Sequence, residues 1–325
     1  MQSFVFAFNA IMPLLLLALL GYFIKRVRLI HTGFIESLNN FIFYVALPVL
    51  IFVTLANLDD FSMMNWPVLL FSIVMVIMVT FIGGFVAYIK DMPKGYRPVI
   101  TQAFYRGNFM LIGIPLALRL GGTEALAILA LLNAFLVPLT NTLSIVVFKV
   151  YNTHNEIQKN IWKEVLNSSI KNPLMIGIIA GVLAMIPGGP WPWIRDSITL
   201  IPDTLDFIGV TATPMAMIAI GAQFEMSRVR VLASPIVVGV IGRLVFVPVL
   251  VFGLAMLMSI RFDFTGAWVA LIALFASPIA VSSVAVTKGL NGDDELASQL
   301  VLWSTALSVV SLYFIIVLFR LLGYI

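Results

Sequence analysis

Long apolar runs divide the sequence into ten segments, each about as long as a membrane-spanning helix. Such a helix needs about 20 predominantly apolar residues. The runs lie at residues 4–24, 36–57, 66–89, 98–119, 124–149, 170–187, 198–222, 233–258, 265–287 and 296–321. The only long polar connection, residues 151–169, separates a first half (residues 1–150) from a second half (residues 170–325). The pattern predicts an all-α polytopic membrane protein with ten transmembrane helices, five in each half.

Composition agrees with a chain that is covered by lipid. Hydrophobic residues make up 61% of the 325 residues and charged residues 10%, whereas a soluble domain is roughly 45–50% apolar and about 25% charged. The mean hydropathy is +1.08. The chain has no cysteine, and both histidines fall in predicted loops, so we expect no metal site and no cofactor. The net charge of +4 comes from the loops and indicates no nucleic-acid partner.

Lysines and arginines gather in alternate loops. One side collects Lys25, Arg26, Arg28, Lys90, Lys94, Arg97, Lys149, Lys159, Lys163, Lys171, Arg228, Arg230 and Lys288, whereas the other collects only Arg119, Arg195, Arg261 and Arg320. Because basic loops stay in the cytoplasm, we expect a multi-pass protein of the cell (inner) membrane with both termini outside and the central loop in the cytoplasm. The first run lacks a preceding basic stretch and a cleavage site, so we expect it to remain as a helix.

The two halves share short motifs at a nearly constant separation. The matched pairs begin at Asn9 and Asn172, Val45 and Thr211, Pro67 and Pro235, and Gly122 and Gly292, with separations of 163, 166, 168 and 170 residues. An odd number of helices in each half turns the second half upside down relative to the first. We therefore expect two inverted five-helix repeats, a plan that recurs in secondary transporters.

Matched interruptions in the fourth and ninth segments mark the candidate substrate-binding site. Proline and glycine loosen a helix, and freed backbone groups are tolerated in a membrane only where they line a cavity or are buried in protein. Matched interruptions at mid-depth therefore indicate a binding site. The alternative is a plain kink, as expected at Pro13, Pro138 and Pro248. The candidate residues at the interruptions are Gly113, Pro115, Ser277, Pro278, Ser282 and Ser283.

Polar side chains accompany the first interruption. Arg106 is either a counter-charge for an anionic substrate or part of a structural ion pair. Asn108 either contacts substrate through its amide or caps the helix that follows. In a regular helix these two side chains would point about 200° apart, so both can serve one site only if the chain leaves helical geometry between them.

Other polar groups within the segments have simpler readings. Arg243 offers the same two alternatives as Arg106, and the acidic candidates for pairing with either arginine are Asp203, Asp206 and Glu225. Asn133 and Asn141 are expected to hold helices together rather than to bind substrate.

The fourth segment carries the spacing Asn108-x-x-x-x-Gly113-Ile-Pro115, which resembles the hallmark of the auxin efflux carrier family. That family includes the plant PIN carriers and bacterial malate and malonate permeases. Further similar stretches run through residues 19–22, 38–48, 213–221 and 277–288. Ser283 stands where plant carriers tend to have proline, and the central loop is short, which together resemble a bacterial permease.

The resemblance implies ten helices with crossing interruptions in helices 4 and 9. It also implies a scaffold of segments 1, 2, 6 and 7, and a mobile domain of segments 3–5 and 8–10. We therefore expect a secondary transporter that moves a small organic anion, such as malate, malonate or an auxin-like carboxylate, by an elevator-type mechanism. The expected partners are this anion, the lipid bilayer, and a second copy bound through the scaffold helices.

The sequence also allows alternatives to a transporter, which are a channel or sensor and an intramembrane enzyme. A channel or a membrane solute sensor on the same fold is the main alternative. An intramembrane enzyme is not expected, because the sequence has no Gly-x-Gly-Asp, His-Glu-x-x-His or Gly-x-Ser-x-Gly motif and no thiol nucleophile.

Overall fold

The computed structural model describes residues 2–58, 66–151, 172–186, 189–223, 233–258 and 265–325. Most of the predicted central loop and Glu225 lie outside these residues. The regular elements in the described part are all helices, and seven of them are long and apolar enough to cross a membrane. This outcome confirms the prediction of an all-α polytopic membrane protein.

One group of helices packs together and is called the first bundle. It comprises α1 (Gln2–Arg26), α2 (Thr32–Phe41), η1 (Ile42–Ala46), α3 (Leu47–Ala56), α8 (Pro173–Ala184), α9 (Pro190–Ser197) and α10 (Leu200–Ala222). Within it α1 packs against α10, α3 packs against α8, and α3 also contacts α10. The label η marks a π-helical turn, and η1 joins α2 to α3 in one apolar helix of 25 residues.

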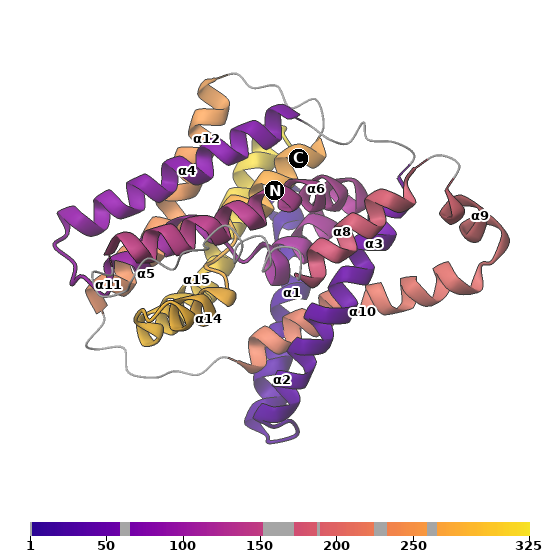
Figure 1. Ribbon diagram of the computed structural model, residues 1–325, viewed down its shortest axis with the longest axis horizontal. Helices are drawn as coiled ribbons and strands as arrows, with labels where there is room; N and C mark the ends of the chain where they lie inside the picture. The colour runs from indigo at the N-terminus through magenta and orange to yellow at the C-terminus, as the bar shows by residue number, and fades with distance from the viewer. Residues whose placement is uncertain (1, 59–65, 152–171, 187–188, 224–232, 259–264) are drawn as a thin grey trace.

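The remaining helices form the second bundle. They are α4 (Trp66–Ile89), α5 (Arg97–Tyr105), η3 (Phe109–Gly113), α6 (Ile114–Tyr151), α11 (Ala233–Ile241), η4 (Gly242–Phe246), α12 (Val247–Leu257), α13 (Thr265–Phe275), α14 (Ser282–Gly289) and α15 (Asp294–Leu321). Here α13 packs along α6, α4 along α5, and α14 along α15. In Figure 1, α4, α5 and α11 lie on the left, and α3, α8 and α10 lie on the right.

Predicted segments and observed helices agree closely in the third segment, where α4 spans residues 66–89. A backbone bend at Gly122 (φ 62°, ψ −153°) divides the long helix α6 between the fourth and fifth predicted segments, and glycine tolerates a positive φ. The helix α9 was not predicted, because its eight residues are too short and too polar for an apolar run.

Small residues bring the helices of the first bundle into backbone contact, as is common in membrane helix pairs. A Cβ atom on Gly21 of α1 would overlap the backbone of Ile218 in α10, and one on Gly221 would overlap Ala18. In the other pair, a Cβ atom on Gly177 of α8 would overlap the backbone of Pro48 in α3. Substitution at these glycines must therefore separate two helices.

We predict that Gly221→Leu destabilises the protein, because the added side chain has to displace the α1 backbone. Overpacking of this kind costs about 1–3 kcal/mol. The matched control is Gly253→Leu in α12, where a Cβ atom would meet nothing within 4 Å. Thermal unfolding in detergent should show a clear loss for Gly221→Leu and little change for Gly253→Leu. Equal melting temperatures for the two variants would contradict this packing.

Candidate functional site

The first interruption of helical structure lies at Arg106–Asn108. Helix α5 ends at Tyr105, the backbone of Arg106 is extended (φ −93°, ψ 87°), and helical structure resumes with η3 at Phe109. The side chain of Asn108 accepts a hydrogen bond from the Leu111 N–H at 3.3 Å and so caps η3. The cap that the sequence offered as one alternative is therefore present.

The interruption is displaced from the glycine and proline that predicted it. Gly113 and Pro115 are buried and helical, at the end of η3 and in the first turn of α6. Proline lacks an N–H group, and it is tolerated at the first turn of a helix, where that group would have no partner. The π-helical turn before it opens the backbone enough for the chain to continue.

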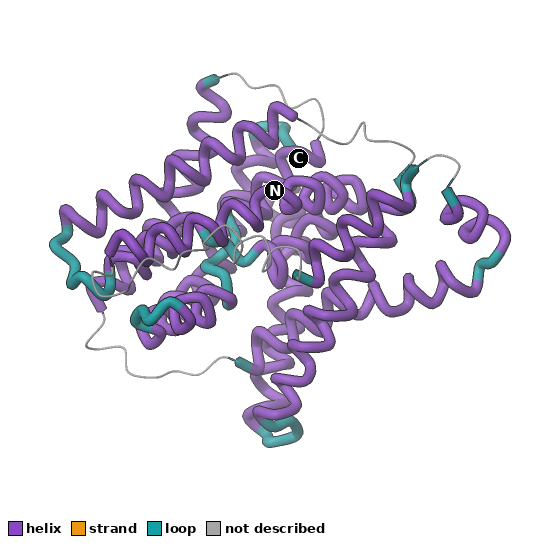
Figure 2. The backbone as a smooth tube through the Cα atoms, viewed as in Figure 1, coloured by secondary structure: helices purple, strands orange, loops and turns teal. Residues whose placement is uncertain are grey.

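The second interruption separates α13, which ends at Phe275, from α14, which begins at Ser282. Its backbone pairs antiparallel with the first interruption, in a bridge between Gly107 and Ile279. The Asn108 N–H donates to the Pro278 carbonyl at 2.7 Å, and the Ala280 N–H donates to the Arg106 carbonyl at 3.0 Å. Both interruptions appear as short loops near the centre of Figure 2. Each therefore supplies hydrogen bonds that the other has lost.

Arg243 in η4 fastens the two interruptions together. Its side chain is fully buried and donates to three backbone carbonyls, Phe104 at 3.0 Å, Leu274 at 2.7 Å and Ser277 at 2.8 Å. These carbonyls lie at the C-terminal ends of α5 and α13, where the helix dipole favours a positive charge. The structural alternative for Arg243 is therefore the observed one, although its partners are carbonyls and not carboxylates.

Gly107 lies directly against this arginine. A Cβ atom at Gly107 would overlap the guanidinium of Arg243 and come within 2.8 Å of the Leu274 carbonyl oxygen. Only glycine leaves room for the guanidinium between the two paired segments.

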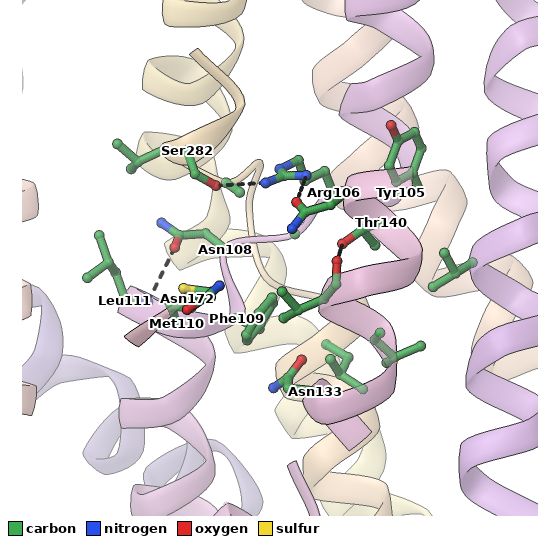
Figure 3. Close-up of a pocket in the computed structure, with 18 of the residues that line it drawn as sticks. Tyr105, Arg106, Asn108, Phe109, Met110, Leu111, Asn133, Thr140, Asn172 and Ser282 are labelled. Carbon is green, nitrogen blue, oxygen red and sulfur yellow. Dashed lines mark hydrogen bonds between the residues drawn. The ribbon is translucent and has the colours of Figure 1, made fainter. Parts of the chain in front are cut away.

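A cavity of about 370 Å³ lies beside the interruptions. Most of its wall is apolar, including Phe43, Phe109, Leu136 and Phe275. Figure 3 shows the labelled polar side chains around it, with Ser282 next to both Arg106 and Asn108. The polar lining residues are Asn39, Tyr105, Arg106, Asn108, Asn133, Thr140, Asn141, Asn172 and Ser282.

Asn108 presents a free hydrogen-bond donor in this cavity. Its side chain is 3% exposed, its oxygen is used by the Leu111 cap, and its amide nitrogen has no partner. A buried donor without a partner costs about 1–3 kcal/mol, so the arrangement favours a ligand that accepts this bond. The Asn108 side chain can therefore cap η3 through its oxygen and bind a ligand through its nitrogen, which are the two roles that the sequence suggested.

Arg106 is held by neutral side chains. It donates to Asn141 at 3.0 Å and to Ser144 at 3.2 Å, and a longer contact of 3.5 Å joins it to Ser282. Its Nε is buried without a partner. Arg106 and Asn108 both line the cavity. They can do so because the chain leaves helical geometry after Tyr105, which is the condition that the sequence analysis set for both side chains to serve one site.

The described acidic residues proposed as partners, Asp203 and Asp206, do not reach Arg106 or Arg243. Asp203 and Asp206 are exposed on α10, whereas ion pairs join Arg97 to Asp91 and Arg195 to Asp196. None of the described residues that line the cavity carries a carboxylate. The charge of Arg106 is thus solvated by hydroxyl and amide oxygens without being neutralised.

The remaining predicted site residues lie in or next to the interruptions but outside the cavity lining. Ser277 donates to the Ala273 carbonyl, and Ser283 is buried with an unpaired hydroxyl. Neither they nor Gly113, Pro115 and Pro278 line the cavity.

Several lining residues were missed by the sequence interpretation. Asn133 and Asn141 were assigned to helix packing, but both face the cavity, and the side-chain oxygen of Asn133 is buried without a partner. Asn39 of α2 and Asn172 at the beginning of α8 line the cavity from the first bundle. Their polarity next to helix ends was the available signal, and Asn172 caps α8 through Leu174.

A polytopic helical protein with a cavity at paired helix interruptions belongs to the class of membrane solute transporters. In the described residues, groups of histidine and carboxylate that could hold a metal ion are absent. The comparisons with known proteins agree with this class. The family model described as "Membrane transport protein" matches residues 6–316.

The chain therefore belongs to the membrane transport protein family, the auxin efflux carrier (PIN-like) family that its motifs resemble. It is similar to an uncharacterized transporter of Methanothermobacter thermautotrophicus, with 25% identity over 94% of this chain and 95% of the relative. It is also similar to an uncharacterized transporter of Methanocaldococcus jannaschii, with 23% identity over 78% of this chain and 80% of the relative. Families of membrane transporters are in general not enzymes.

We predict that Arg243→Met strongly destabilises the fold, since it leaves three buried carbonyls without their donor, each at a cost of about 1–3 kcal/mol. The melting temperature of Arg243→Lys should lie between those of the wild type and Arg243→Met, because lysine keeps the charge but lacks the planar fork. The control is Arg119→Met, which removes one exposed 3.4 Å contact. Thermal unfolding in detergent gives the comparison, and a wild-type melting temperature for Arg243→Met would show that the three bonds contribute little.

Proposed function

We propose that the protein is a secondary transporter of a small organic anion, and that the cavity beside the two interruptions is its binding site. One observation carries this proposal. Among the described residues that line the cavity, Arg106 carries a positive charge and none carries a carboxylate that would neutralise it. A charge inside a membrane-spanning segment without a counter-ion is costly, and a carboxylate ligand would supply that counter-ion.

The helix ends around the cavity favour the same charge. Phe109, Met110 and Leu111 at the beginning of η3, and Ser282 at the beginning of α14, all line the cavity. The N-terminal end of a helix carries a partial positive charge and free N–H groups. The C-terminal ends of α5 and α13, which would repel an anion, are covered by Arg243 on the other side.

The cavity dimensions suit a small carboxylate with an apolar portion or a short dicarboxylate. A volume of about 370 Å³ is at the low end for small-molecule sites. Arg106 and the Asn108 amide offer donors to one carboxylate, while Phe43, Phe109 and Phe275 surround the rest of the space. Malate, malonate and auxin-like carboxylates are therefore the substrates to test first.

The positions of the interruptions support a fold of ten transmembrane helices in two inverted repeats. Helices α5 and α13 end at Tyr105 and Phe275, a separation equal to the 170 residues between Gly122 and Gly292. The carbonyls of Phe104 and Leu274, which bind the same arginine, have that separation too. The pairs α1 with α10 and α8 with α3 are also related by exchange of the halves.

Two contacts at the beginning of α1 support an orientation in which both termini lie on the same face of the membrane. The guanidinium of Arg320, at the end of α15, lies 4.5 Å from the ring centre of Phe6. Arg119 donates to the carbonyl of Asn9 at 3.4 Å. All four residues belong to the face that the basic loops assign to the outside, which supports an inner-membrane protein with a cytoplasmic central loop.

The division into two bundles supports the proposal of an elevator-type mechanism. The cavity takes Asn39, Phe43 and Asn172 from the first bundle and its other lining residues from the second. A second bundle that carries the interruptions past a fixed first bundle would move the site across the membrane. The first bundle would also provide the contact for a homodimer.

We predict that Asn108→Ser separates capping from binding. Serine caps a helix about as well as asparagine, so stability should change little, but the amide donor is lost. A hydrogen bond to a charged group is worth about 1.5–3 kcal/mol, or roughly ten- to a hundredfold in affinity. Ligand-dependent thermal stabilisation measures this. Asn108→Ala should lose stability as well, and wild-type affinity in Asn108→Ser would leave Asn108 as a cap alone.

We further predict saturable carboxylate uptake into proteoliposomes that is accelerated by unlabelled carboxylate inside. Arg106→Gln should lower the affinity for carboxylates more than for their neutral amides, and Arg106→Lys should retain part of it. Arg119→Gln, outside the cavity, is the control. A channel would instead give uptake that does not saturate and is not accelerated from inside, and a sensor would bind the anion without moving it.

A further inference from the structure

A second, apolar groove of about 310 Å³ lies between the two bundles and shares no lining residue with the polar cavity. Its walls come from α1 and α10 of the first bundle and from α6 and α15 of the second, and Ile112 of η3 also contributes. Its lining is mostly aliphatic, and its polar side chains are Tyr22, Thr305 and Ser308. The hydroxyl of Ser308 donates to the Thr305 carbonyl at 2.7 Å, and the hydroxyl of Thr305 is buried without a partner. The groove therefore suits a hydrocarbon chain and gives a polar solute little to bind.

One face of α1 forms the long wall of this groove and ends in basic residues. The lining positions on α1 are Ile11, Leu14, Leu15, Ala18, Leu19 and Tyr22, a spacing that keeps one helical face. Lys25 and Arg26 follow Tyr22 by three and four residues, so they continue the same face at the helix end. Arg26 is exposed, and Arg28 follows it beyond the helix.

The groove is open to the lipid and has the length of one bilayer leaflet. Leu19 is 52% exposed and Tyr22 41% exposed, although both line the groove. From Ile11 to Tyr22 the helix rises about 16 Å at 1.5 Å per residue, and half of a hydrocarbon core of about 30 Å is about 15 Å. A tyrosine at the end of such a stretch is typical of the membrane interface.

From this geometry we propose that the groove binds an anionic phospholipid of the cytoplasmic leaflet. One acyl chain lies between α1, α10 and α15, and the phosphate lies at Arg26 with Lys25 and Arg28 nearby. The apolar walls, the leaflet-sized length and the positive charge at one end select this occupant together. The assignment to the cytoplasmic leaflet rests on the proposed orientation, in which these basic residues face the cytoplasm.

The site has a consequence for transport, because its walls belong to both bundles. A lipid in the groove contacts Met217 and Ile220 of the first bundle and Leu116 and Ala306 of the second. Movement of one bundle past the other would change the groove, so a bound lipid favours the arrangement seen here. The ligand that binds one of two arrangements shifts their populations toward it.

The test measures lipid binding to the purified protein in detergent by native mass spectrometry and by thermal unfolding. The probes are phosphatidylglycerol and phosphatidylcholine with the same acyl chains, and inorganic phosphate alone. We expect phosphatidylglycerol to stabilise the protein more than phosphatidylcholine, and phosphate alone to have no effect. Equal stabilisation by the two lipids, or stabilisation by phosphate alone, would overturn the proposal.

Two pairs of variants locate the lipid. Arg26→Gln should weaken phosphatidylglycerol binding about fivefold and leave phosphatidylcholine unchanged, whereas Lys90→Gln removes an exposed charge at the end of α4 and should change neither. Ala306→Phe fills the groove and should weaken both lipids, whereas Val310→Phe, on the exposed side of α15, should not. An unchanged preference in Arg26→Gln would contradict the headgroup position, even if Ala306→Phe fails to fold.

These measurements do not depend on transport. A protein that moves no carboxylate but prefers phosphatidylglycerol would overturn the proposed function and leave the lipid site intact. A lipid-free protein that native mass spectrometry shows as a dimer, and that binds no lipid as a monomer, would assign the groove to a second copy and overturn the lipid site.

Discussion

The bonds from Arg243 to the ends of α5 and α13 are the interaction on which the rest of the site depends. Two helices stop inside an apolar bundle and leave carbonyl groups that no water can satisfy. One guanidinium satisfies three of them and brings a positive charge to two negative helix ends. The antiparallel bridge between Gly107 and Ile279 can form only because these ends are held together, with Gly107 leaving room for the guanidinium.

The two sides of the interruptions therefore have different electrostatic characters. On the side of Arg243 the helix ends are satisfied and the surroundings are fully buried. On the other side lie the beginnings of η3 and α14, the cation of Arg106 and the free amide nitrogen of Asn108. A single arginine supplies the structural bonds, so the groups on the cavity side remain available to a ligand. This separation lets one interruption serve both folding and binding.

Much of the fold could be predicted because membrane helices leave a strong apolar pattern. Helix α4 was predicted residue for residue, and the bend at Gly122 lies between the predicted fourth and fifth segments. The interruptions lie in the predicted segments, but the first, at Arg106–Asn108, ends seven residues before Pro115. A proline marks a missing donor without saying which neighbouring turn opens, and here a π-helical turn absorbed the defect.

The site was less predictable because its contacts are made by groups that the sequence does not distinguish. Arg106 and Asn108 were identified, whereas Asn141 was assigned to packing although it accepts a bond from Arg106. On a helix that is apolar on most sides, the sequence does not distinguish an asparagine that faces a cavity from one that faces a neighbouring helix. The partners of Arg243 are backbone carbonyls, which every residue has, so the search for an acidic partner among Asp203 and Asp206 had no correct answer. If the halves align with the separation of Pro67 and Pro235, the position that matches Arg243 is Met75, so this arginine has no counterpart to signal it.

The central claim is that the cavity at the interruptions opens to the two faces of the membrane in turn. Because the chain has no cysteine, a single cysteine in the variant Thr140→Cys can be labelled with a membrane-impermeant maleimide from either side of sealed, oriented proteoliposomes. The account predicts labelling from both sides, with both rates slowed by a saturating carboxylate that occupies the cavity. Labelling from one face alone under all conditions, or rates that no carboxylate changes, would contradict it.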